Sequence, residues 1–185
     1  MKTQTEHKIL ISRIGDLDSG LIEEIGEDLF NIFGYPVESL PIIEDIDFAL
    51  DPVRNQYHST MILEKLAGLA PPDTLKIVAV FDKDLFIPIL THVYGEAQLG
   101  GKASIISTYR LTDNLPPVDP QRAFYNRLLK EAIHELGHTF NIRHCPDRSC
   151  AMHYCRTIKD VDTKSGRFCR YCKILLEDEK KRLAK

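Results

Sequence analysis

The stretch between His134 and Met152 constrains the fold more than any other part of the chain, because two of its histidines must share one face of a helix. It contains the pattern His-Glu-x-x-His at residues 134–138. An α-helix turns by about 100° per residue, so residues four positions apart lie about 40° apart around its axis. The imidazoles of His134 and His138 can therefore reach one metal ion, and Glu135 can reach a water molecule beside it.

A third histidine follows after a turn. His144 comes six residues after His138 and would point away from the first two histidines if the helix continued. Asn141 can end the helix, since asparagine tolerates the left-handed conformation better than other non-glycine residues. The chain can then bring His144 back toward the same ion. Three neutral imidazoles with one open coordination position are the ligand set of a catalytic zinc ion.

The histidines belong to a long amphipathic helix that follows a loop at residues 115–120. Asp119 is a good N-cap, Pro120 is a good first helical residue, and the helix should run to about Phe140. An apolar stripe along this helix faces the core, which holds the histidines on a rigid element. The stripe consists of Phe124, Leu128, Leu129, Ala132, Ile133, Leu136 and Phe140.

The residues before this helix predict an α/β layer. Strands are expected at residues 8–13, 37–43 and 75–81, and helices at residues 21–33 and 53–69. The third of these strands is almost entirely apolar, which indicates a strand that is covered on both faces.

Two further segments predict strands that break the alternation of strands and helices. Residues 92–98 and 103–110 flank a turn at Gly100 and Gly101, and one of them can lie antiparallel at the edge of the sheet. A peptide can then pair with the free backbone groups of that strand. An ordinary hairpin without a ligand is the alternative interpretation.

Length and composition indicate one compact domain, which we expect to be cytoplasmic. The chain has 185 residues, of which 43% are hydrophobic, so it can bury a substantial core. It has no apolar run long enough to span a bilayer, and we expect no secretion signal at its amino terminus. In a reducing compartment its five cysteines are more often metal ligands than disulfide partners.

The cysteines have spacings that suit a metal site. Cys145-x4-Cys150 and Cys169-x-x-Cys172 both offer usable ligand pairs. Cys155 follows Cys150 at the same spacing that separates the first pair, so spacing alone does not exclude it as a ligand. The histidines without a partner in the sequence are expected to be structural or surface residues. They are His7, His58 and His92.

The full pattern resembles the long zinc-binding motif of the metzincin metalloproteases, with Asn141 at a position where that clan has glycine. The cysteine pairs and Met152 resemble the archaemetzincins within this clan. The match covers residues 134–172 closely and residues 97–107 less specifically. A left-handed asparagine costs on the order of 1 kcal/mol more than glycine, which the fold can absorb.

The resemblance implies a metzincin-type α/β fold with α+β character. It would have a mixed twisted sheet, a zinc-binding active-site helix and a small Cys-rich, zinc-stabilised C-terminal subdomain. Residues 1–185 would form a single metzincin-like domain. Its upper α/β subdomain would comprise residues 1–144 and its lower Cys-rich subdomain residues 145–185, with the active-site cleft between them.

The resemblance also implies two zinc ions per chain, one catalytic and one structural. His134, His138 and His144 would bind the catalytic ion, Glu135 would be the general base, and Met152 would pack beneath the site. The structural ion would be held by four thiolates. These belong to Cys145, Cys150, Cys169 and Cys172.

Three residues that follow Met152 also have expected roles. Cys155 is expected to be a free thiol and His153 a non-ligand. Met152-His153-Tyr154 resembles the Met-x-Tyr pattern of astacin-like and serralysin-like metzincins, in which the tyrosine approaches the zinc. Tyr154 can stabilise an oxyanion here, unless the nearby cysteine ligands impose a different turn.

We therefore predict a zinc-dependent metallopeptidase that hydrolyses peptides or proteins, with Glu135 taking a proton from the attacking water. The alternative is a zinc-stabilised peptide-binding module with little or no turnover. A third hypothesis, nucleic-acid binding through the basic residues 180–185, is disfavoured because the chain has a net charge of −3 and its acidic remainder would repel phosphate. No nucleic acid or membrane partner is expected.

Overall fold

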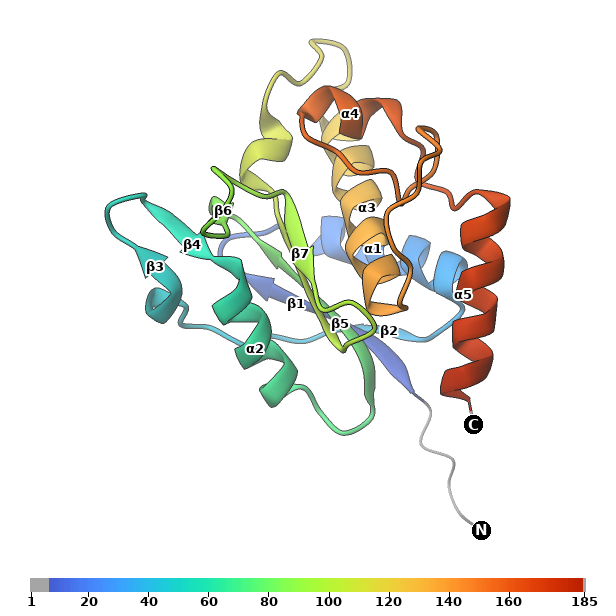
Figure 1. The fold of residues 1–185 in the computed structure, drawn as a ribbon. Helices are drawn as coiled ribbons and strands as arrows, with labels where there is room; N and C mark the ends of the chain where they lie inside the picture. Colours follow the sequence, from blue (N-terminus) through green and yellow to red (C-terminus); the bar gives the residue numbers. More distant parts are fainter. Residues whose placement is uncertain (1–6, 185) are drawn as a thin grey trace.

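A five-stranded mixed sheet forms the centre of the protein, in a computed structural model that describes residues 7–184 (Figure 1). Residues 1–6 and Lys185, which include most of the amino-terminal segment and the end of the basic tail, lie outside the described residues. The strands of this sheet are β1 (Lys8–Ile14), β2 (Val37–Ser39), β5 (Thr74–Phe81), β7 (Gly95–Ala97) and β8 (Ala103–Ser107).

The sheet has the order β2-β1-β5-β8-β7. Neighbouring strands are parallel except at one edge, where β7 runs antiparallel to β8. The predicted antiparallel edge strand is therefore confirmed. The predicted strand at residues 37–43 is shorter than expected and lies at the opposite edge, where the strand ends before Pro41.

Helices cover both faces of this sheet (Figure 1). α1 (Ser19–Phe33) and α3 (Pro120–Thr139) pack on one face, and α2 (Ser59–Leu69) packs on the other. Successive side chains of a strand point to opposite faces, so Val78 of β5 joins the core under α1 and α3 whereas Ile77 joins the core under α2. The mixed α/β architecture predicted from the sequence is confirmed.

The chain after α3 returns to the first of these cores. It forms α4 (Ile158–Thr163) and α5 (Arg170–Leu183), and Cys172 and Leu176 of α5 pack with residues of α1 and α3. No helix among residues 7–184 is long and apolar enough to cross a bilayer. The basic residues near the end of α5 pair with acidic residues three positions earlier. The pairs are Lys180–Glu177, Lys181–Asp178 and Arg182–Glu179.

The segment before α2 differs from the sequence-based expectation. β3 (Leu50–Asp51) and β4 (Gln56–His58) form a hairpin that joins β6 (Leu85–Phe86) in a second, three-stranded sheet. The prediction of a helix from residue 53 was wrong, because Asn55 adopts a left-handed φ of 53° and turns the chain. Met61 and Leu69 of α2 are exposed. The packed side consists of Ile62, Leu63 and Leu66.

The two ends of α3 have the predicted caps. The Asp119 carboxylate accepts a hydrogen bond from the first turn of the helix. At the other end Asn141 adopts a left-handed φ of 60°. The N–H of Ile142 then donates to the carbonyl of Gly137 at 3.1 Å, and the N–H of Asn141 donates to that of His138 at 2.9 Å. This pair of hydrogen bonds is a Schellman motif, and the predicted turn at Asn141 is confirmed.

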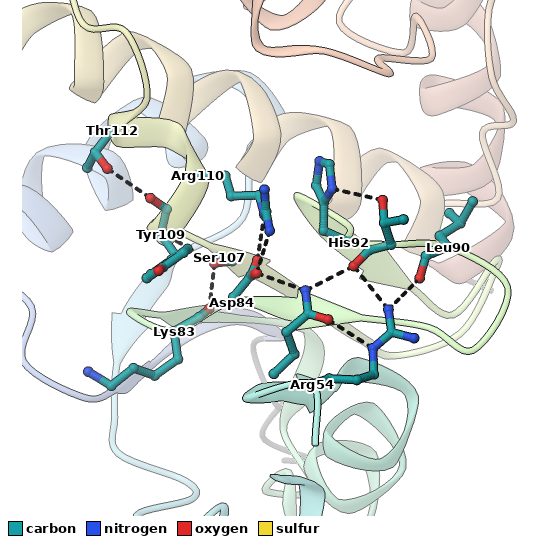
Figure 2. A network of polar contacts seen from close by, with 11 residues as sticks. Arg54, Lys83, Asp84, Leu90, His92, Ser107, Tyr109, Arg110 and Thr112 are labelled. Atoms are coloured by element: carbon teal, nitrogen blue, oxygen red, sulfur yellow. Dashed lines mark hydrogen bonds and ion pairs between the residues drawn. The ribbon is translucent and has the colours of Figure 1, made fainter. Parts of the chain in front are cut away.

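A network of polar contacts holds the loop between β6 and β7 (Figure 2). The Asp84 carboxylate accepts two hydrogen bonds from the guanidinium of Arg110, at 2.8 and 2.7 Å, and one from the amide of Gln56 at 2.8 Å. Gln56 and Arg54 both donate to the backbone carbonyl of Thr91, at 2.9 and 3.0 Å. The second sheet thereby fixes the position of this loop.

Replacing Asp84 with alanine is expected to lower the free energy of unfolding by about 1–3 kcal/mol, because Arg110 and Gln56 lose their shared acceptor. Urea denaturation measures this change. The control is Asp113→Ala, which removes an exposed carboxylate that makes no side-chain hydrogen bond with any other residue from 7 to 184. Equal stability of the two variants would contradict the role of this network.

Candidate active site

Three histidines from α3 and the bend after it converge on one point. His134 and His138 lie one turn apart on α3, and His144 follows the left-handed turn at Asn141. One ring nitrogen of each histidine lies within 4.8 Å of those of the other two. The structure thus brings together the three imidazoles that the helix geometry and the predicted turn led us to expect.

The orientation of two of these imidazoles suits a tetrahedral zinc ion. The Nδ1 atom of His134 lies 2.8 Å from the carbonyl oxygen of Ala151, and that of His138 lies 2.7 Å from the carbonyl oxygen of Ile142. Each Nδ1 therefore donates its proton to a carbonyl, and both Nε2 atoms carry lone pairs. These Nε2 atoms face each other at 3.1 Å, which is repulsive without a cation between them. Tetrahedral zinc with Zn–N bonds of about 2.0–2.1 Å separates two nitrogen ligands by about 3.3 Å.

The surroundings keep the histidines in the form that binds metal. Burial lowers the pKa of all three imidazoles, to about 4 for His138 and well below its usual value for His134. Neutral imidazole is the ligand form, so no proton competes with the metal near neutral pH. His144 is the most exposed of the three, which leaves the site open to solvent on its side.

Glu135 belongs to α3, and its side chain lies against the edge strand β7. Its pKa is raised well above the usual value, first because burial disfavours the carboxylate and then because Glu131 adds negative charge. A Cβ atom on Gly95 of β7 would lie 2.7 Å from Cγ of Glu135 and 2.7 Å from the carbonyl oxygen of Ile105. Glycine at this position therefore makes room for Glu135. Gly95 was not predicted as a site residue, although a glycine inside a strand can signal such a close approach.

The histidines and Glu135 line a cleft of about 800 Å³. Most of its remaining lining comes from the loop before β7, from β7 itself, and from residues 154–156, and Leu99, Glu131 and Arg143 complete it. His92, which we expected to be a structural or surface residue, belongs to this lining. Tyr154 lies beside His144, with ring centroids 4.9 Å apart and 43% of the tyrosine exposed.

Met152 packs against the helix that carries the histidines. It is fully buried, and a Cβ atom on Gly137 of α3 would clash with its sulfur. Gly137 lies one residue before His138, so Met152 supports α3 directly beneath the histidines. The preceding residue, Ala151, supplies the carbonyl that orients His134. The segment around Met152 therefore positions both the helix and one imidazole.

Four cysteines converge on a second point, with their sulfur atoms within 4.8 Å of one another. The sulfurs of Cys145 and Cys169 are 3.8 Å apart, far beyond the roughly 2.05 Å of a disulfide. Tetrahedral zinc with Zn–S bonds of about 2.3 Å separates two sulfurs by about 3.8 Å. Cys150 and Cys172 complete the group, and Cys155 lies outside it.

A buried ion pair involves a side chain one helical turn before Glu135 on α3. The Lys164 ammonium is 2.7 Å from the Glu131 carboxylate, and the two side chains are 0% and 4% exposed. Glu131 lies one turn before Glu135 on α3 and lines the cleft. This pair was not predicted from the sequence. The four-residue spacing of the two glutamates was a usable signal for Glu131, whereas Lys164 follows α4 and has no such pattern.

Comparisons with known proteins agree with this geometry. Residues 4–178 match the model of peptidase family M54. The archaemetzincin of Methanocaldococcus jannaschii is 34% identical over 172 residues, which cover 92% of this chain and 93% of that protein. The crystal structure of the Methanopyrus kandleri archaemetzincin is similar with a TM-score of 0.85 at 31% identity, covering 98% of this chain and 100% of that chain.

A second solved structure, the Archaeoglobus fulgidus archaemetzincin complexed with malonate, has a TM-score of 0.77 at 32% identity and covers 91% of this chain and 99% of that chain. The histidine and cysteine groups supply candidate zinc sites within the shared fold. The resemblance inferred from the motif is confirmed, and the chain belongs to peptidase family M54, the archaemetzincins, which makes it a zinc metallopeptidase acting on peptides or proteins.

Proposed function

We propose that this metallopeptidase uses His134, His138 and His144 to hold its catalytic zinc and Glu135 as its general base. The observation that carries this proposal is the approach of two unprotonated Nε2 atoms to 3.1 Å, with the third histidine beside them. Zinc bound by three neutral imidazoles keeps its charge of +2 and supplies Lewis acidity toward a water and a substrate carbonyl.

Glu135 has the environment of a general base. Its burial and the nearby Glu131 raise its pKa, so its carboxylate binds a proton more tightly than an exposed one does. It takes a proton from the attacking water and delivers it to the leaving amine. Lys164 limits this shift, because its ammonium favours the ionised carboxylate.

The peptide substrate is proposed to lie along β7 as an added strand. An edge strand has backbone groups that no neighbouring strand uses, and Gly95, Glu96 and Ala97 of β7 line the cleft. Residues 154–156, which follow the histidine motif, also line this cleft. This lining supports the proposed division into an upper subdomain of residues 1–144 and a lower one of residues 145–185.

We also propose that the four cysteines hold a second, structural zinc, which gives two ions per chain. Four thiolates close the coordination sphere and quench the Lewis acidity of the ion. The 3.8 Å distance between the sulfurs of Cys145 and Cys169 supports this assignment. The ion would fasten the start of α5 to the segment that contains Met152.

Glu135→Gln is expected to lower kcat on the order of 10²- to 10⁴-fold while both zinc ions stay bound, because the variant removes only the proton acceptor. Cleavage of a broad peptide library and zinc analysis of the same samples measure these effects. Glu64→Gln, on the exposed face of α2, is the matched control. If zinc-loaded wild type and Glu135→Gln were equally inert, the peptide-binding module would replace the peptidase mechanism.

Gly95→Ala is expected to reduce kcat sharply, because the new methyl group meets the side chain of Glu135 and the backbone of Ile105. The histidine zinc should remain bound, since the three atoms nearest the new methyl group belong to Glu135 and Ile105 and not to a histidine. Gly68→Ala is the matched control, because nothing lies within 4 Å of a Cβ atom at that site. Full activity of Gly95→Ala would show that Glu135 is not held against β7.

Cys172→Ser is expected to lose one zinc ion and to melt at a lower temperature, because a structural site contributes its binding free energy to folding. Cys155→Ser is the matched control and should keep both ions, since Cys155 lies outside the cysteine group. Elemental analysis and thermal denaturation measure the two effects. Loss of an ion from Cys155→Ser but not from Cys172→Ser would reverse the assignment of the ligands.

A further inference from the structure

A second hollow adjoins the cleft beside His144. It has a volume of about 450 Å³ and is formed by the chain around α4. Tyr154 and Arg156 line both the cleft and this hollow, so the two spaces lie against the same two side chains. A peptide that leaves the cleft past these side chains would reach the hollow, which we call the basic groove. Its lining residues are Arg148, His153, Tyr154, Arg156, Lys159, Asp160 and Thr163.

The basic groove carries positive charge without matching acidic partners. Arg148, Arg156 and Lys159 are exposed, and their side-chain nitrogens make no ion pair or hydrogen bond within residues 7–184. Asp160 is the one acidic residue of the lining. Its carboxylate accepts hydrogen bonds from the backbone N–H and the hydroxyl of Thr157, at 2.9 and 2.8 Å, in the cap of α4. These bonds lower the pKa of Asp160, so it stays ionised and offsets one of the three positive charges.

Two acidic residues of the neighbouring cleft also have hydrogen-bond or ion-pair partners within the protein. Glu96 accepts a hydrogen bond from the hydroxyl of Thr60 at 2.9 Å, and Glu131 pairs with Lys164 at 2.7 Å. The remaining glutamate of the cleft, Glu135, is the proposed general base. Glu131 is therefore offset by Lys164, and Glu96, which keeps its charge, lines the cleft and not the basic groove.

We propose that the basic groove binds an acidic stretch of the substrate on one side of the scissile bond. This inference rests on the peptidase mechanism proposed above and names a substrate class for the same site. Guanidinium groups bind carboxylates through paired hydrogen bonds, and Arg143 adds a further exposed guanidinium where the cleft passes His144. Asp and Glu side chains beyond the cleaved bond would meet Arg148, Arg156 and Lys159.

An acidic peptide fits this groove better than a nucleic acid does. The groove shares Tyr154 and Arg156 with the cleft that contains the histidines, so a peptide bound in that cleft can extend to it. The other concentration of basic residues, at the end of α5, is paired with acidic residues of the same helix. The net charge of the chain, −3, also disfavours an extended phosphate backbone.

The test compares cleavage of acidic peptides with that of matched peptides in which Asn and Gln replace Asp and Glu, on each side of a common cleavable core. Zinc-loaded wild type is expected to prefer the acidic peptide on one side by about 3- to 10-fold in kcat/KM, since each exposed ion pair contributes about 0.2–1 kcal/mol. The preference should lie in KM rather than kcat, because the contacts are the same in the ground state and the transition state. It should weaken with added salt.

The double variant Arg148→Gln/Lys159→Gln is expected to bring the acidic-to-neutral ratio close to one. The charge-matched control Lys173→Gln/Lys181→Gln, on the exposed surface of α5, should keep the wild-type ratio. Cleavage of the neutral peptide without any acidic preference in wild type would overturn the groove assignment and leave the peptidase mechanism intact.

Binding to zinc-loaded Glu135→Gln, measured by fluorescence anisotropy of the same labelled peptides, tests the groove separately from turnover. Tighter binding of the acidic peptide that Arg148→Gln/Lys159→Gln abolishes supports the groove even if no peptide is cleaved. Equal binding of acidic and neutral peptides contradicts it. A single-stranded oligonucleotide that binds through Arg148 and Lys159 more tightly than the acidic peptide would replace the proposal with nucleic-acid binding.

Discussion

The whole site depends on two imidazole nitrogens that face each other with their lone pairs. His134 and His138 could turn away from this arrangement if nothing held them. Two backbone carbonyls, from Ala151 and Ile142, accept the Nδ1 protons and keep both Nε2 atoms directed at one point. A cation at that point would remove the repulsion, so the fold presents a geometry that suits metal binding.

The positions of these carbonyls explain much of the remaining structure. Ile142 lies directly after the left-handed Asn141, so the Schellman turn that ends α3 also places the acceptor for His138 and redirects the chain toward His144. Ala151 belongs to the segment that Met152 anchors beneath α3 and that Cys150 connects to the cysteine group. The proposed structural site and the proposed catalytic site are thus linked through three consecutive residues.

Much of this arrangement could be predicted from the sequence, because it depends on local geometry. The spacing of His134 and His138, the cap at Asp119 and the turn at Asn141 each follow from the conformational preferences of a few neighbouring residues. The helix predicted from residue 53 failed for the same reason, since apolar spacing does not reveal the left-handed turn at Asn55.

Contacts between distant segments could not be predicted in this way. Lys164 reaches Glu131 only because the chain after α3 folds back over the helix, and the basic groove forms where residues 148–163 surround one hollow. The room that Gly95 gives Glu135 depends equally on how β7 packs against α3. Contacts of these kinds depend on tertiary packing, and the spacing of residues along the sequence does not reveal them.

X-ray absorption at the zinc edge of the zinc-loaded protein tests whether the histidines and the cysteines bind separate ions, because it counts sulfur and nitrogen or oxygen neighbours of the bound ions. Two ions with the proposed ligands give equal numbers of sulfur neighbours at about 2.3 Å and of nitrogen or oxygen neighbours at about 2.0–2.1 Å. An excess of sulfur, as when a thiolate takes the open position beside the histidines, would contradict the proposed ligand sets.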